Sequence, residues 1–172
     1  ELFKTPRIRE LAGYINNTAP REYKQIELAE KKEYYTLSSA QKRLYFLQQM
    51  DKDSTAYNIP VVLLLEGIVD KNKLEQSIRR LIRRHESLRT SFIIVDEEPV
   101  QRIHDEVDFE IEYLATDGLG QTRTFDLSKA PLLRVGLGKI EEEKHLFLVD
   151  MHHIISDGVS SRVLVQDFSS LC

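Results

Sequence analysis

The stretch from His145 to Gly158 reads HLFLVDMHHIISDG, and it sets the architecture that we expect for the chain. Its first half, HLFLVD, is an apolar run of the kind that forms a buried strand. Two adjacent histidines end that strand, and an aspartate and a glycine follow shortly after. Functional side chains often lie where a strand gives way to a loop, and histidine titrates near neutral pH. The stretch therefore predicts either a strand-end site or a turn held by histidines.

Four interpretations of these residues compete on their chemistry alone. His153 can act as a catalytic base or hydrogen-bond donor facing a cleft, with His152 on the opposite side because strand side chains alternate. The pair can bind a metal with Asp157, although the spacing lacks a zinc-hydrolase signature. They can equally be core histidines at a strand end. A nucleophilic Ser156 or Ser160 is disfavoured, because no nucleophile-elbow pattern surrounds either.

The composition is that of an ordinary globular protein. The chain has 172 residues, of which 41% are hydrophobic and 30% charged, with a net charge of −4. This balance suits one domain or one lobe of a larger one, and it gives no general attraction to nucleic acid or to an anionic membrane. The longest uninterrupted apolar run, residues 61–65, is far too short to cross a bilayer. A single cysteine excludes an internal disulfide, so we expect a cytoplasmic location.

Apolar periodicity predicts an α/β fold in which helices pack on a mixed sheet. Helical patterns cover 7–15, 40–50, 71–88 and 159–168, and strand patterns cover 61–67, 90–95, 100–104, 107–114, 131–140 and 145–151. The expected inward residues are Ala40, Leu44 and Leu47, then Leu74, Ile78, Leu81 and Ile82, then Val159, Val163 and Phe168. Asp70 should cap the third helix. The strand at 61–67 is apolar throughout, so we expect it to be buried on both faces.

Four motifs resemble one family. HHIISDG fits the HHxxxDG pattern of the condensation domains of non-ribosomal peptide synthetases, which chloramphenicol acetyltransferase-like acyltransferases share. LSSAQKRLYFLQQ resembles the first condensation-domain motif and RRHESLRTSF the second. FDLSKAPLLRVGL resembles the run that leads to the histidine strand. The motifs occur in the family's order, and the resemblance covers residues 34–172.

The resemblance implies a domain organisation. Residues 1–16 resemble the last helix of a peptidyl carrier protein, 17–33 form a linker, and 34–172 form the N-terminal lobe of a condensation domain. The family domain is a pseudo-dimer of two similar lobes with the active-site tunnel between them. We therefore expect a piece of a longer polypeptide that lacks the second lobe and is inactive alone. Family members also usually have a longer segment where this chain has only ATDGLGQTRT.

The activity that the resemblance implies is peptide-bond formation. A downstream carrier presents an aminoacyl thioester, whose amine attacks the donor thioester on an upstream carrier. Both substrates hang on 4′-phosphopantetheine arms of partner carriers, so we expect no cofactor and no metal on this chain. The expected partners are the two carriers, an adenylation domain and the second lobe, without nucleic acid or membrane. Alternatives are another HHxxxDG acyltransferase, an epimerisation domain, or a non-catalytic module that docks carrier proteins.

The resemblance also assigns roles to residues of the histidine motif. His153 is the expected catalytic residue, either as a base for the attacking amine or by holding that amine, and His152 supports the loop. Asp157 is expected to form a structural ion pair. Gly158 keeps the channel open for the phosphopantetheine arm.

The second motif is expected to support the same site. Arg84 is the expected partner of Asp157 in the ion pair, and Arg89 supports the same region. The alternative for both arginines is simple surface solvation.

Overall fold

The computed structural model describes residues 7–17, 27–114 and 122–171, and it divides the chain into two units, 1–31 and 32–172. The first unit holds α1, Ile8–Asn17, in which no residue is buried. The second unit holds all the other elements. Parts of the expected carrier helix, of the linker and of the short connection at 115–124 lie outside the described residues.

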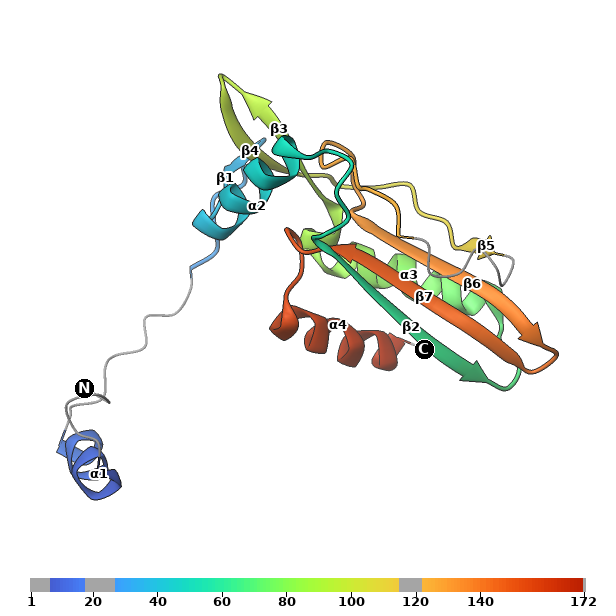
Figure 1. The fold of residues 1–172 in the computed structure, drawn as a ribbon, viewed down its shortest axis with the longest axis horizontal. Helices are drawn as coiled ribbons and strands as arrows, with labels where there is room; N and C mark the ends of the chain where they lie inside the picture. Colours follow the sequence, from blue (N-terminus) through green and yellow to red (C-terminus); the bar gives the residue numbers. More distant parts are fainter. Residues whose placement is uncertain (1–6, 18–26, 115–121, 172) are drawn as a thin grey trace. The chain divides into compact units, whose positions relative to one another are not determined.

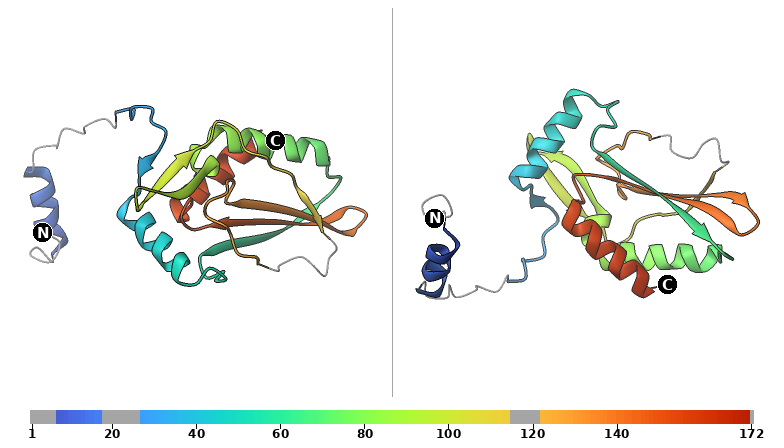
Figure 2. Two further views of the ribbon diagram at one scale, coloured as in Figure 1. Left: turned by 90° about the horizontal axis from the view of Figure 1, so that it is seen from above. Right: turned by 60° about the horizontal axis from the view of Figure 1, so that its bottom comes forward.

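A four-stranded sheet forms the larger layer of the second unit. Its order is β2-β7-β6-β5, with bounds Asn58–Glu66, Lys144–His152, Leu133–Glu141 and Glu112–Leu114. β7 is antiparallel to both neighbours, whereas β5 runs parallel to β6. Two helices, α3 at Lys71–Arg84 and α4 at Gly158–Leu171, lie on one face of this sheet (Figure 2). The predicted mixed sheet with flanking helices is therefore confirmed.

A smaller sheet lies beside α2, which spans Ser39–Met50 (Figure 1). Its order is β1-β4-β3, with bounds Tyr35–Thr36, Glu98–Ile103 and Thr90–Val95. Asp96 and Glu97 join β3 to β4 with φ of 48° and 65°. Two consecutive positive values are typical of the tight hairpin turns whose twist matches the strands. The hairpin that the sequence predicts between these strands is confirmed.

The core contains the predicted face of α3. Asp70 accepts a hydrogen bond from the Lys73 backbone N–H at 3.1 Å, as the sequence predicts. Ile78, Leu81 and Ile82 are buried, and Leu74 packs at the edge. The least exposed large apolar side chains are Leu88, Leu132, Phe92 and Val135. Leu88 belongs to the short 3-10 helix η1 at Glu86–Arg89, and Phe92 belongs to β3 of the smaller sheet. Leu132 precedes β6 and Val135 lies in β6 of the larger sheet, so the core joins both sheets.

The expected inward faces of α2 and α4 are partly wrong. In α2 the buried residues are Leu44, Tyr45 and Gln48, while Ala40 and Leu47 are exposed. In α4 the buried residue is Leu164, and Phe168 and Leu171 pack beside it, while Val159 and Val163 are exposed. Phe168 stacks on Phe147 of β7, with ring centroids 6.2 Å apart. The inward face of α2 includes Tyr45 and Gln48, and the inward face of α4 includes Phe168. Apolar spacing alone does not predict these aromatic and polar contacts.

The expectation for β2 is also wrong. Val61, Val62, Leu63 and Leu64 are each between 42% and 52% exposed. In the described part of the chain β2 is an edge strand that pairs only with β7. An apolar run shows that a strand can be buried, but its neighbours decide whether it is.

Candidate functional site

The two motif histidines separate at the end of β7. His152 is the last residue of the strand and is fully buried. His153 follows it and is exposed. Their backbone N–H groups donate in different directions, from His152 to the Leu132 carbonyl at 3.1 Å and from His153 to the Tyr57 carbonyl at 2.7 Å. The alternation that the sequence predicts is therefore present, with one ring in the core and one at the surface.

His152 is a core histidine. Its Nδ1 accepts a hydrogen bond from the Ile154 backbone N–H at 3.1 Å, and the Phe125 ring meets its ring edge to face. Burial, and secondly the charge of His153, lowers the pKa of His152 to about 4. The ring is therefore neutral at physiological pH and unsuited to exchange protons with a substrate.

His153 has the geometry of a hydrogen-bond acceptor. Its Nδ1 lies 2.8 Å from the Ser156 carbonyl oxygen. A carbonyl only accepts, so Nδ1 of the neutral ring carries the proton and Nε2 keeps a lone pair. The side chain borders a hollow of about 570 Å³ between α2 and the start of α4. We call this the His153 hollow, and its polar lining residues are Ser38, Gln41, Arg43, Tyr57, His153, Ser156, Asp157 and Ser160.

Asp157 caps α4 and does not pair with Arg84. Its Oδ1 accepts hydrogen bonds from the backbone N–H groups of Val159 at 3.1 Å and Ser160 at 2.8 Å. The backbone and side-chain bonds from Ser160 lower the pKa of this exposed carboxyl. Arg84 Nε lies 3.0 Å from Asp167 Oδ2 instead. The expected Asp157–Arg84 pair is wrong because the end of α3 lies beside a later part of α4, more than two turns from Asp157.

Gly158 is the first residue of α4. A Cβ added there would meet no atom within 4 Å, and its φ is not in the positive region. Neither a sharp turn nor close packing within this chain requires glycine at this position. The channel role that the resemblance implies stays a prediction.

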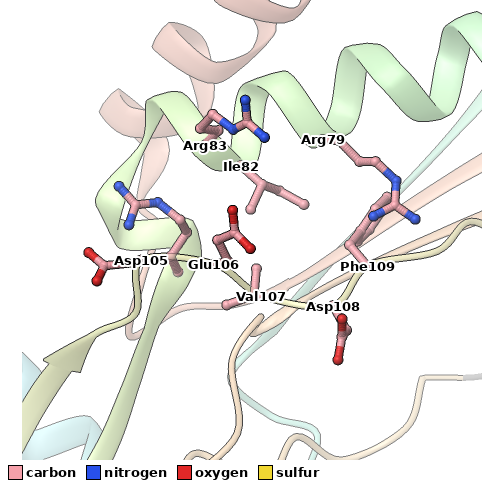
Figure 3. A pocket seen from close by; sticks show the side chains of 9 residues that line it. Arg79, Ile82, Arg83, Asp105, Glu106, Val107, Asp108 and Phe109 are labelled. Carbon is pink, nitrogen blue, oxygen red and sulfur yellow. The ribbon is translucent and has the colours of Figure 1, made fainter.

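Arg89 lies in a different hollow from His153. Its Nη1 donates to the His104 carbonyl, and its side chain borders a hollow of about 320 Å³ between α3 and residues 105–109. Figure 3 shows Arg79 and Arg83 of α3 on one side of this hollow, with acidic side chains across from them. Arg89 therefore does not line the His153 hollow, and its expected support of that region stays a prediction.

Three further side chains border the His153 hollow, those of Gln41, Arg43 and Tyr57. Gln41 and Arg43 belong to the first motif. Gln41 lies one helical turn before the buried Leu44, and this spacing is the signal that could have placed it near a site. Tyr57 lies outside all four motifs, and no pattern in the sequence indicates it. Its position follows from the pairing of β2 with β7.

Metal ligands do not gather in the described residues. Within 7–17, 27–114 and 122–171, no three His, Cys, Asp or Glu side chains lie close enough to hold a metal ion. His152 and Asp157 instead accept hydrogen bonds from nearby backbone N–H groups. In the same ranges, no helix has the length and apolar character needed to cross a membrane.

Comparison with known proteins identifies relatives. Residues 31–172 match the family described as condensation domain. Tyrocidine synthase 2 of Brevibacillus parabrevis is 49% identical over 99% of this chain, which spans 5% of that protein. Bacitracin synthase 2 of Bacillus licheniformis is 46% identical over 99% of the chain, which spans 7% of that protein. The chain thus spans a small part of the curated relatives that it matches.

Solved structures share the fold. The starter condensation domain of the rhizomide synthetase RzmA is 24% identical, with a TM-score of 0.72 over 81% of this chain and 37% of that one. The X-domain in its complex with OxyB from teicoplanin biosynthesis is 26% identical, with a TM-score of 0.75 over 84% of this chain and 34% of that one. The described chain therefore has the fold of part of these larger domains.

Folding stability should depend on pH through His152. Its pKa of about 4 lies below the ordinary 6.5, so the unfolded chain binds more protons between these values and stability falls as the pH drops from 6.5. A tenfold change in proton affinity corresponds to about 1.4 kcal/mol, so the loss by pH 4 is roughly 3 kcal/mol. Urea denaturation of wild type and His152→Gln at pH 7 and pH 4 measures this loss. Wild type should lose more than the variant, and equal losses would contradict the assignment.

Asp157→Ala should weaken the start of α4 without unfolding the protein at neutral pH. Asparagine also caps helices, so Asp157→Asn should keep most of the thermal midpoint that alanine loses. The folded-state pKa of Asp157 is lowered, so its contribution is present above the ordinary pKa and disappears as the pH falls through the folded-state value. Thermal unfolding followed by circular dichroism tests this order. Complete loss of folding by the alanine variant at neutral pH would indicate a buried ion pair instead.

Proposed function

This chain belongs to the condensation domain family, and we propose that it supplies the catalytic histidine for peptide-bond formation within a larger synthetase. The observation that carries the proposal is the exposed His153, whose Nδ1 is held by the Ser156 carbonyl while Nε2 is left for a substrate. Relatives that share about half of its residues are peptide synthases such as tyrocidine synthase 2.

The proposed reaction joins two carrier-bound substrates. The amine of the acceptor aminoacyl thioester attacks the donor carbonyl, a C–N bond forms, and the donor C–S bond breaks. The released thiol of the donor phosphopantetheine takes up the proton that the amine loses. Two flexible arms must meet in one place, and bringing them together removes much of the entropic barrier.

His153 would accept a hydrogen bond or the proton from the attacking amine through Nε2. An exposed histidine suits this role because an imidazole can both accept and donate a proton. His152 cannot replace it, since its ring is buried and its Nδ1 already accepts the Ile154 N–H. The two adjacent histidines would therefore divide the work, one reacting and one holding the loop.

The larger protein would surround this chain with partners. We propose residues 1–16 as the last helix of a carrier protein, 17–33 as a linker and 34–172 as the N-terminal lobe of the domain. Relatives match 99% of the chain, so they have counterparts of the residues before the family match at 31. The partners would be a second lobe, two carriers with phosphopantetheine arms and an adenylation domain, in the cytoplasm.

A second candidate function is protein docking without catalysis. The likeness to the X-domain favours it, because that domain was solved in a complex with OxyB. The histidine motif favours catalysis, since HHIISDG retains both histidines, the aspartate and the glycine. The loss of product in a histidine variant separates the two functions.

His153→Ala should abolish most product formation while the protein stays folded. The synthetase module that contains this chain would be used, with both carriers loaded, and intact mass spectrometry of the downstream carrier would detect the dipeptidyl product. We expect a rate loss of about 10²- to 10⁴-fold, the usual range for a general base. His104→Ala is the matched control, because His104 bonds to Ser91 at 2.8 Å and does not border the His153 hollow. Equal product from His153→Ala and wild type would contradict a catalytic role.

Gly158→Leu tests the proposed channel. Since a Cβ at Gly158 meets nothing within 4 Å in this chain, the variant should keep its thermal midpoint. If a phosphopantetheine arm passes there, the side chain should lower product formation at least about tenfold by obstructing it. Val165→Leu, on an exposed part of α4, is the control. Unchanged product from Gly158→Leu would show that the arm takes another path.

A further inference from the structure

Gln48 is a buried polar residue in the last turn of α2. Its side chain is only 3% exposed, although helix positions that face a core are normally apolar. Its Nε2 donates to the carbonyl oxygens of Lys52 at 3.3 Å and Ser54 at 3.2 Å. Carbonyl oxygens only accept, so these two bonds orient the amide and turn Oε1 toward His152.

His152 continues the chain of hydrogen bonds from Gln48. The Ile154 N–H donates to Nδ1 of His152, so this nitrogen carries no proton. The neutral ring then has its proton on Nε2, which faces Oε1 of Gln48 at 3.4 Å, a long hydrogen bond. The lowered pKa of His152, about 4, agrees with a neutral ring. In this series of hydrogen bonds, the Ile154 N–H donates to His152, His152 donates to Gln48, and Gln48 donates to the Ser54 carbonyl.

Gln48 also holds the segment on the other side of His153. The turn that includes Lys52 and Ser54 leads into Tyr57, whose carbonyl accepts the His153 N–H at 2.7 Å. The backbone of His153 is therefore bracketed by two hydrogen bonds, one to Tyr57 and the next, from Ile154, to the His152 ring. Gln48 is bonded to the His152 ring, which is one acceptor, and to the turn that leads into Tyr57, which carries the other.

We propose that Gln48 is a positioning residue for His153, acting through the His152 ring on one side and the turn before Tyr57 on the other. The inference rests on the proposed function of His153. Gln48 does not border the His153 hollow, so it does not contact a substrate there. Its loss should therefore lower kcat for condensation and leave KM for the loaded carriers unchanged.

Gln48→Met and Gln49→Met form a matched pair of variants. Methionine keeps the length of the side chain but removes the amide, which leaves His152 Nε2 and two carbonyls without their partner. Gln49 is the exposed neighbour on the same helix, and its replacement should change nothing. In the module assay we expect kcat of Gln48→Met to fall about a hundredfold, since small displacements of a catalytic group cost this much. Equal kcat for the two variants would overturn the inference.

Gln48→Glu adds a readout that a purely structural role would not move. A protonated glutamic acid can donate to one carbonyl and accept from His152, whereas the ionised form places a charge against the Lys52 and Ser54 carbonyls. Burial raises the pKa of such a carboxyl, so the rescue should be measurable in mildly acidic buffer. The ratio of variant to wild-type kcat should rise as the pH falls. A ratio that does not change with pH would contradict the proposed hydrogen-bond pattern.

Hydrogen exchange tests the positioning without activity. In Gln48→Met, peptides that contain the His153 and Ile154 amides should exchange at least about tenfold faster, because their acceptors lose support. Peptides of α3 should not change, and Gln49→Met should match wild type throughout. If wild type forms no product, the proposed function fails, and this exchange result alone decides whether Gln48 orders the loop. Unchanged exchange in Gln48→Met would overturn the positioning role.

Discussion

The burial of His152 at the end of β7 is the constraint on which the candidate site depends. Because successive strand residues point to opposite sides, an inward His152 directs the chain so that His153 emerges at the surface. The buried ring is not left unpaired, since Ile154 donates to one nitrogen and Gln48 faces the other. Buried polar groups are tolerated when they are satisfied in this way. A core residue thereby determines where the exposed His153 lies.

Segments that are distant in the sequence converge on this ring. Gln48 comes from the first motif, and Phe125 comes from the FDLSKAPLLRVGL motif. Both residues contact His152, so these two motifs contact the histidine motif directly. The other side of Phe125 is covered by Arg134, whose guanidinium lies 3.8 Å from the ring centroid. Arg134 also approaches the buried Asp150 at 3.7 Å. Asp150 is buried and Arg134 is partly buried, so this contact supplies a positive charge beside a carboxylate that is shielded from water.

The second motif, RRHESLRTSF, serves the fold more than the His153 hollow. Leu88 and Phe92 lie in the centre of the core. Arg84 and His85 both meet one oxygen of Asp167, which ties the end of α3 to α4. Because α4 begins directly after the histidine loop, this contact steadies the site from a distance. The motif is therefore linked to the site through the packing of α3 on α4, but its arginines do not border the hollow.

The sequence by itself determined the helices, most strands, the mixed sheet, the Asp70 cap and the separation of the two histidines, because these depend on local periodicity and strand alternation. The strand expected at 107–114 is shorter, since β5 covers only Glu112–Leu114, and the short β1 at Tyr35–Thr36 was not expected. Tertiary structure decided the rest. The partner of Arg84, the exposure of β2 and the role of Gln48 each depend on which elements become neighbours, and residue spacing does not encode that. Tyr57 borders the hollow because β2 pairs with β7. Hydrogen bonds and ion pairs act over a few ångströms, so only the folded arrangement of distant segments could assign these contacts.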